Sequence, residues 1–154
     1  MAEGDRGLET LQVWQKAMSL AKDVYENALP ALPAEEKWAL KDQLRRAVQS
    51  VPANIAEGYG RFYYQESIRF CYIARGSLEE TFSHVTLAQQ IGYLPSEPYR
   101  KLAQEIDELR RMLNGYINFL KQSKRGANEP GATLSVRDEP VPYLPDPEPE
   151  APNP

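Results

Sequence analysis

Basic residues recur at helical spacing in the second quarter of the chain. Lys37, Lys41 and Arg45 are four residues apart, so on a helix they would stack in one stripe. A stripe of this kind can neutralise phosphates and gain free energy from counterion release. The alternative that stays open is an ordinary solvated helix face. The nucleic-acid-binding residues predicted from this pattern are Lys37, Lys41, Arg45, Arg46 and Arg61.

Aromatic residues follow this basic stretch, and two more arginines lie beyond them. Aromatic rings beside cations can stack on unpaired bases, whereas the same rings can equally pack a loop or a subunit interface. Both interpretations stay open at this point. The aromatic residues are Tyr59, Phe62, Tyr63 and Tyr64, and the arginines that would extend the basic surface are Arg69 and Arg75.

Catalytic, metal and cofactor sites are not expected. Glu57 is better placed to accept from Arg61, or from Arg45 or Arg46, than to act as a general base, because no second catalytic group lies at a fixed spacing. One histidine, His84, and one cysteine, Cys71, cannot make a specific zinc site. The chain also has no glycine-rich phosphate loop and no nucleophile motif, so we expect a protein that is not an enzyme.

A proline lies inside an otherwise helical run, at Pro52. The apolar spacing does not slip across it, which favours one kinked helix over two short ones. The carbonyl of Val48 then needs another donor, which Asn54, Ser50 or a neighbouring helix could supply. Gly58 suits the left-handed position just past a helix end. The structural motif predicted here comprises Pro52, Asn54, Glu57 and Gly58.

Four amphipathic helices account for residues 10–125. The first is capped by Thr10 and stops near Leu29, before Pro30. The second opens at residues 34–36, and Trp38 begins its apolar face. The apolar stripe of the first helix comprises Leu11, Trp14, Met18, Ala21, Tyr25 and Ala28, widened by Val13, Leu20 and Val24.

The third helix, from about Gln65 to Ile91, carries apolar residues on two faces. This favours either a subunit interface or a central place in the monomer. Gly92 ends it, and Ser96 is the predicted N-cap of the fourth helix. The heptad-like seam of that helix comprises Tyr99, Leu102, Ile106, Leu109, Leu113, Tyr116 and Leu120. Short connections and no strand pattern predict an all-α, antiparallel up-down left-handed four-helix bundle.

The formal charge of -4 is unevenly distributed. The segment from Gly126 onward holds six of the 22 acids and one of the 18 bases, which leaves 17 bases and 16 acids in residues 1–125. The same segment holds 8 of the 13 prolines, a composition typical of disorder. We therefore predict a flexible N-terminus at 1–9, a bundle at 10–125 and an acidic proline-rich disordered tail at 126–154. A single cysteine, no secretory signal and no apolar run near the roughly 20 residues that span a bilayer predict a cytoplasmic protein without a membrane partner.

Four stretches resemble the four-helix-bundle family named for the 23S rRNA intervening-sequence protein. They are LQVWQKAM at 11–18, VPANIAEGYGR at 51–61, IRFCYIARGSLEE at 68–80 and GYL at 92–94. The resemblance covers roughly residues 8–123 and implies a left-handed up-down bundle that assembles as a ring of five copies. The accessory protein of diversity-generating retroelements, a relative with a similar fold, works as a basic ring that binds a reverse transcriptase and nucleic acid. Most members have no assigned activity.

The function expected from pattern and resemblance together is a non-catalytic homo-oligomer. It would serve as a scaffold or accessory factor for RNA or for an RNA-handling protein, without a cofactor. The alternative is a protein-interaction ring with no nucleic-acid role, in which the tail is a tether or a competitor for the basic face.

Overall fold

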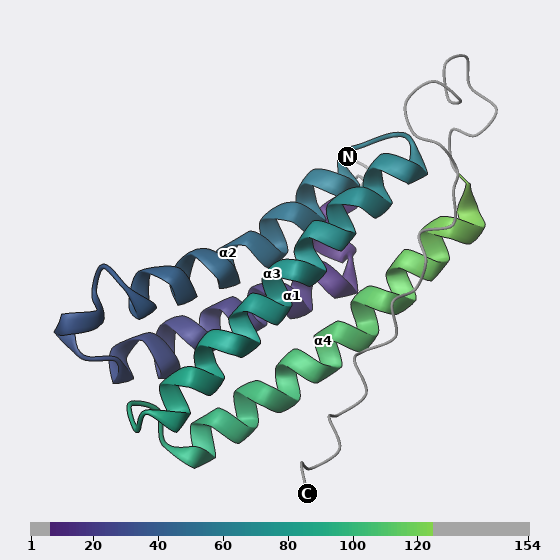
Figure 1. Ribbon diagram of the computed structural model, residues 1–154. Coiled ribbons are helices and arrows are strands. Elements are labelled where there is room, and N and C mark those ends of the chain that lie inside the picture. The colour runs from purple at the N-terminus through teal and green to yellow at the C-terminus, as the bar shows by residue number, and fades with distance from the viewer. Residues whose placement is uncertain (1–6, 125–154) are drawn as a thin grey trace, which may run out of the picture.

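Four antiparallel helices form the fold of the computed structural model, which describes residues 7–124 (Figure 1). The all-α bundle predicted from the sequence is therefore confirmed. The expectations for residues 1–6 and for the tail at 126–154 lie outside the described residues. The long helices are α1 (Gln12–Asp23), α2 (Leu40–Tyr59), α3 (Tyr64–Gln90) and α4 (Ser96–Ser123).

Helix α1 continues through a π-helical turn, η2 (Val24–Ala28), into a 3-10 turn, η3 (Leu29–Ala31), that contains Pro30. The predicted stop near Leu29 is confirmed. Four residues of the predicted apolar stripe, Val13, Leu20, Val24 and Ala28, are buried, whereas Met18 and Tyr25 are exposed, which corrects those two positions. The Thr10 cap is also wrong, because Leu11 precedes the helix and the Thr10 hydroxyl donates to the Gly7 carbonyl at 2.8 Å. The buried face comprises Val13, Ala17, Leu20, Val24 and Ala28.

Helix α2 begins later than predicted. Residues Ala34–Glu36 form a separate 3-10 turn, η4, and the α-helix starts only at Leu40. The Glu36 carboxylate accepts from the Leu40 backbone N–H at 3.1 Å, so it satisfies one of the donors that a helix start leaves open. Trp38, predicted to begin the apolar face, lies in the connection and is 78% exposed.

Helix α2 passes through Pro52 without a break, as its apolar spacing predicts. Asn54 donates to the Ser50 carbonyl and to the Ser50 hydroxyl, each at 2.8 Å, so the expected side-chain donor is present but serves Ser50 rather than Val48. The Ser50 hydroxyl also bonds that of Ser77 on α3 at 2.8 Å. The proline turn is therefore tied both to its own helix and to the next one.

Gly58 is inside α2 and not in a left-handed cap, which corrects the prediction. A β-carbon added there would lie 2.9 Å from the Ser67 carbonyl oxygen and 3.0 Å from the β-carbon of Phe70. The glycine is needed because the backbones of α2 and α3 approach closely at this point. The Ser67 hydroxyl, which is buried, donates to the Gly58 carbonyl at 2.8 Å.

The turn between α3 and α4 follows the predicted chemistry at one end and departs from it at the other. Gly92 adopts a φ of 87° directly after α3, and the Tyr93 backbone N–H bonds the Ala88 carbonyl at 2.9 Å. At the start of α4, Pro95 holds the position before the helix and Ser96 is its first residue, so Ser96 is not the N-cap.

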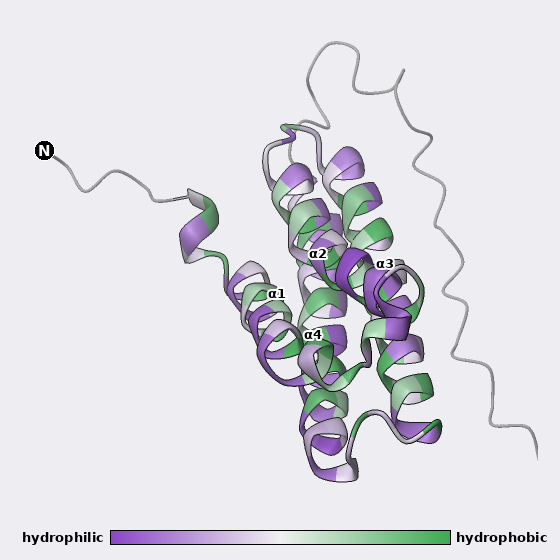
Figure 2. Cartoon of the chain, turned by 90° about the vertical axis from the view of Figure 1, so that its left-hand side faces the viewer, coloured by the Kyte–Doolittle hydropathy of each residue, from purple (hydrophilic) through white to green (hydrophobic). Residues whose placement is uncertain are grey.

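The core of α4 follows the predicted seam except at its two tyrosines: Tyr99 and Tyr116 are only partly buried, and Ile117 is buried beside Tyr116. Hydrophobic and hydrophilic segments alternate along each helix, as expected for rods with one buried face (Figure 2). Within the described residues, no helix combines the length and apolar character required to cross a membrane. The buried residues of α4 are Leu102, Ile106, Leu109, Leu113, Ile117 and Leu120.

Candidate functional site

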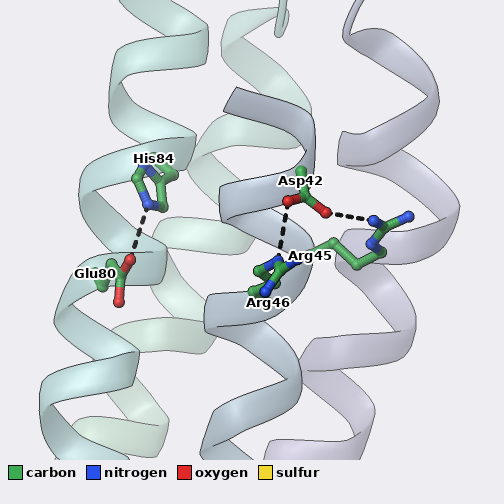
Figure 3. Close-up of polar contacts among 5 residues, drawn as sticks. All are labelled: Asp42, Arg45, Arg46, Glu80 and His84. Atoms are coloured by element: carbon green, nitrogen blue, oxygen red, sulfur yellow. Dashed lines mark hydrogen bonds and ion pairs between the residues drawn. The ribbon is translucent and has the colours of Figure 1, made fainter. Parts of the chain in front are cut away.

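The predicted basic surface on α2 contains a carboxylate between its two arginines. Asp42 accepts from the Arg45 guanidinium through one oxygen and from Arg46 Nε, at 2.9 Å, through the other (Figure 3). The hydrogen bond from Arg45, reinforced by Arg46, lowers the pKa of Asp42. Its side chain is only 12% exposed. The carboxylate therefore stays ionised and offsets one of the two positive charges.

The two lysines of the predicted stripe do not stack with Arg45 as one row. Lys37 precedes α2, and its ammonium lies 4.9 Å from the centre of the Trp38 ring. Lys41 is in α2, and among the described residues it makes no ion pair. Because the helix begins at Leu40, the regular spacing breaks between Lys37 and Lys41, and only Lys41 keeps the four-residue helical spacing with Arg45.

The last predicted cation, Arg61, bonds the Glu57 carboxylate at 2.7 Å, which confirms the expected ion pair. Its guanidinium also lies 5.2 Å from the centre of the Phe70 ring. Of the aromatic residues in this connection, Phe62 is 52% exposed and Tyr64 is buried. The Phe62 and Tyr63 rings meet edge to face with centres 5.4 Å apart, so these aromatic residues divide between packing and exposure.

A second cation cluster lies between α3 and α4, and only one of its members was considered from sequence. The Tyr72 ring has the Arg75 guanidinium 4.8 Å from its centre and the Lys121 ammonium 5.8 Å from it. Arg75 also donates to the Asn114 side-chain oxygen at 3.1 Å. Among the described residues, neither cation pairs with a carboxylate. Lys121 is 49 residues from Tyr72 in the chain, so no local spacing could reveal the contact.

Two neighbouring carboxyl groups, Asp23 of α1 and Glu105 of α4, influence each other's pKa. Burial, a hydrogen bond with Asp23 and the charge of Asp23 raise the pKa of Glu105 to about 7. Burial opposes ionisation of Asp23, but hydrogen bonding with Glu105 and Asn27 and the positive charge of Lys101 outweigh it and lower the pKa of Asp23. Lys101 lies 3.7 Å from Asp23 Oδ2. When Glu105 is protonated, it can donate a hydrogen bond to the ionised Asp23.

His84 and Cys71, the residues with side chains suited to metal binding or nucleophilic chemistry, lie in surroundings that favour a structural role. His84 Nε2 lies 3.3 Å from the Glu80 carboxylate on the same helix (Figure 3). Burial raises the pKa of the Cys71 thiol to about 12, which keeps it protonated. Across residues 7–124, no group of three or more histidine, cysteine, aspartate or glutamate side chains is arranged to hold a metal ion.

Comparison with solved structures supports the fold. The chain is similar to a protein of unknown function from the S23 ribosomal protein family of Bacteroides thetaiotaomicron. The TM-score is 0.63 at 24% sequence identity, over 68% of this chain and 97% of the other. No curated protein matches the chain. The model of the 23S rRNA-intervening sequence protein family matches residues 9–115, and the chain belongs to this family.

Proposed function

We propose that this protein is a non-catalytic scaffold that assembles from several copies and binds RNA or an RNA-handling protein. The observation that carries the RNA role is that two cations, Arg75 and Lys121, lie against the Tyr72 ring. Their partners among the described residues are neutral. The family name, which refers to a 23S rRNA element, agrees with such a partner.

The charge of this cluster is available to phosphates. Contact with an aromatic face orients a cation but does not neutralise it, whereas a carboxylate does. Arg75 is held by Asn114 and Tyr72, which reduces the conformational entropy that it loses on binding an anion. The α2 surface differs, because Asp42 already occupies donors of both Arg45 and Arg46.

Assembly is supported by three exposed apolar residues on one side of α3 and its C-terminal cap, which form a stripe that polar residues interrupt. Ile73, Leu87 and Ile91 are each 47–49% exposed. They lie within about 40° of one another around the helix, given 3.6 residues per turn, and the Glu80–His84 pair lies between Ile73 and Leu87 on the same face. A second copy would cover this stripe and gain the free energy of burying it. A ring of five copies, which the family resemblance implies, is the proposed assembly.

The RNA role is tested by titrating the full chain with a structured RNA at several salt concentrations. We expect affinity to fall steeply with salt, and Arg75→Glu with Lys121→Glu to weaken it by about tenfold or more. The matched pair Lys41→Glu with Arg45→Glu alters the surface predicted from sequence. If only that pair weakens binding, the RNA contact is on α2 and the assignment to the Tyr72 cluster is wrong. Binding that ignores salt and both pairs would refute the RNA role.

The second candidate is an assembly whose partner is a protein, with no nucleic-acid role. The exposed apolar stripe favours it, because apolar contact suits a polypeptide better than a phosphate backbone. Light scattering on Leu87→Lys with Ile91→Lys tests the assembly itself. We expect this variant to have the mass of a single copy, while Met18→Lys on the exposed side of α1 keeps the wild-type mass. An unchanged mass in the α3 variant would exclude this stripe as the interface.

A further inference from the structure

An aromatic hollow opens at the end of the bundle where α4 finishes. It has a volume of about 510 Å³ and is formed by the end of α2, the start of α1 and the last turns of α4. The Tyr116 and Phe119 rings are stacked, with centres 6.3 Å apart and planes inclined by 17°, and Phe119 is 61% exposed. The lining side chains carry no charge. They are Gly7, Thr10, Leu11, Gln12, Val13, Tyr59, Met112, Tyr116 and Phe119.

We propose that this hollow docks the chain's own proline-rich C-terminal segment, residues 140–154. Proline-rich segments in the polyproline II conformation bind in grooves lined by aromatic rings. The stiff chain loses little entropy on binding, and the proline rings pack flat against the aromatic rings. The segment holds seven of the chain's 13 prolines and includes the run Pro-Val-Pro-Tyr-Leu-Pro. The volume of the hollow is within the usual range for small binding pockets, about 300–1,000 Å³.

The chain's connectivity favours its own tail over a free peptide. Lys124 follows Phe119 by five residues, so the tail leaves α4 about 8 Å along the helix axis from the hollow, at 1.5 Å per residue. Residues 125–139 connect the two, and a flexible linker of this length spans roughly 20 Å on average. The effective concentration of the tethered segment is then in the millimolar range, so even weak intrinsic affinity fills the hollow.

The charge pattern is compatible with this occupant. The segment carries Asp146, Glu148 and Glu150, and none of the lining residues is acidic. The lining includes the polar side chains of Gln12 and Tyr59, which can donate to backbone carbonyls that a polyproline helix leaves free. Apolar packing and carbonyl recognition therefore come from the same short surface.

Methionine methyl groups provide a direct test in the full chain. Met112 lines the hollow, while Met18 is on the outer side of α1 and does not. A nitroxide is attached through Ala151→Cys, and the buried Cys71 thiol, with its raised pKa, is not labelled. The nitroxide speeds the relaxation of nearby ¹³C-methyl signals, so this paramagnetic relaxation enhancement reports which methionine the tail approaches. We expect strong relaxation enhancement at Met112 and weak relaxation enhancement at Met18.

Three variants and a mixing experiment complete the test. Phe119→Ser should reduce the enhancement at Met112 to the Met18 level, as should replacing Pro140, Pro142 and Pro145 by serine. Phe62→Ser, an exposed ring outside the hollow, should leave it unchanged. Equal enhancement at both methionines, or enhancement that survives Phe119→Ser, would overturn the proposal. In the mixing experiment, one protein carries the nitroxide but no ¹³C, and the other carries ¹³C-methyl groups but no nitroxide. Enhancement in this mixture would assign the contact to a neighbouring copy and overturn docking within one chain.

Discussion

The two sides of α3 are packed by different means. Against α2, small residues bring the backbones together: Gly58 faces Ser67, and Ser50 bonds Ser77 across the seam. Against α4, long side chains bridge a wider gap, as when Arg110 donates to Glu79 at 3.1 Å. At Gly58 the first seam leaves no room for a substituent, whereas the second seam presents charged and aromatic groups at its edge.

This difference separates stability from binding within one helix. A close backbone contact has no spare volume, so a single added methyl group must displace a whole helix. Long polar side chains at a seam can change partners without moving the backbone. We therefore expect substitutions on the α2 side of α3 to change folding free energy, and those on the α4 side to change ligand affinity.

Gly58→Ala should have the largest effect on the stability of the bundle. Its β-carbon would meet the Ser67 carbonyl oxygen at 2.9 Å, a backbone atom that cannot rotate away. We expect a loss of about 1–3 kcal/mol in the free energy of unfolding, measured by urea denaturation.

Gly115→Ala is the matched control on α4, where an added β-carbon meets nothing within 4 Å. Alanine favours a helix interior over glycine by about 0.5–1 kcal/mol, so this variant should be more stable than wild type. If Gly58→Ala is also stabilising, the close approach of α2 and α3 is wrong.

Ser67→Ala removes the hydroxyl that joins the same two helices. The Gly58 carbonyl loses a donor at 2.8 Å in a buried setting, which we expect to cost about 1–2 kcal/mol. Thermal unfolding of this variant beside Ser83→Ala, an exposed serine on α3, measures the effect. Equal melting temperatures would show that the bond contributes nothing net.

The sequence predicted the existence of the bundle better than the roles of its conspicuous residues. The steps of three and four in α4 predicted all of its core except Ile117, because helical period alone decides which face is buried. The role of Gly58 was mistaken, since a glycine near a helix end predicts a cap, whereas a close approach depends on a residue of another helix.

Contacts between residues far apart in the chain, and the point at which a helix starts, explain the other differences between the predicted and the observed site. The spacing of Lys37, Lys41 and Arg45 predicted a basic row, but Asp42 and the late start of α2 change its charge and its geometry. The contact between Lys121 and Tyr72 exists only because α3 and α4 run side by side. Local periodicity therefore predicts burial, and the partners of a charge require the fold.

The carboxyl pair between α1 and α4 places a polar bond inside a seam, and Glu105→Gln tests it. Glu105 has a pKa of about 7 in the fold, above the 4.5 of the free side chain. The folded state therefore binds this proton more tightly than the unfolded state. Stability contributed by the proton is complete below about pH 4.5 and is lost as pH rises through about 7. Glutamine supplies a donor to Asp23 at every pH and removes this dependence.

We expect Glu105→Gln and wild type to unfold at similar temperatures at pH 5, and the variant to be more stable at pH 8. Because Glu105 is half-buried, solvent reduces the difference to about 1 kcal/mol, or a few degrees in melting temperature. Asp23, with its lowered pKa, affects stability only at more acid pH and in the opposite sense. Parallel pH profiles for the two proteins would show that the fold does not raise the pKa of Glu105.

Asn114→Ala should have the smallest effect on stability and is the sharpest test of the contrast between the two sides of α3. It removes the neutral acceptor that holds Arg75 at 3.1 Å but leaves both cations and the Tyr72 ring in place. Because the bond is at the edge of the wider seam, we expect a change within about 0.5 kcal/mol in unfolding free energy. RNA affinity should fall by roughly two- to threefold as Arg75 gains freedom, measured by titration at fixed salt. A large loss of stability with unchanged affinity would mean that the α4 side of α3 is packed as tightly as the α2 side, and that its cations serve the fold.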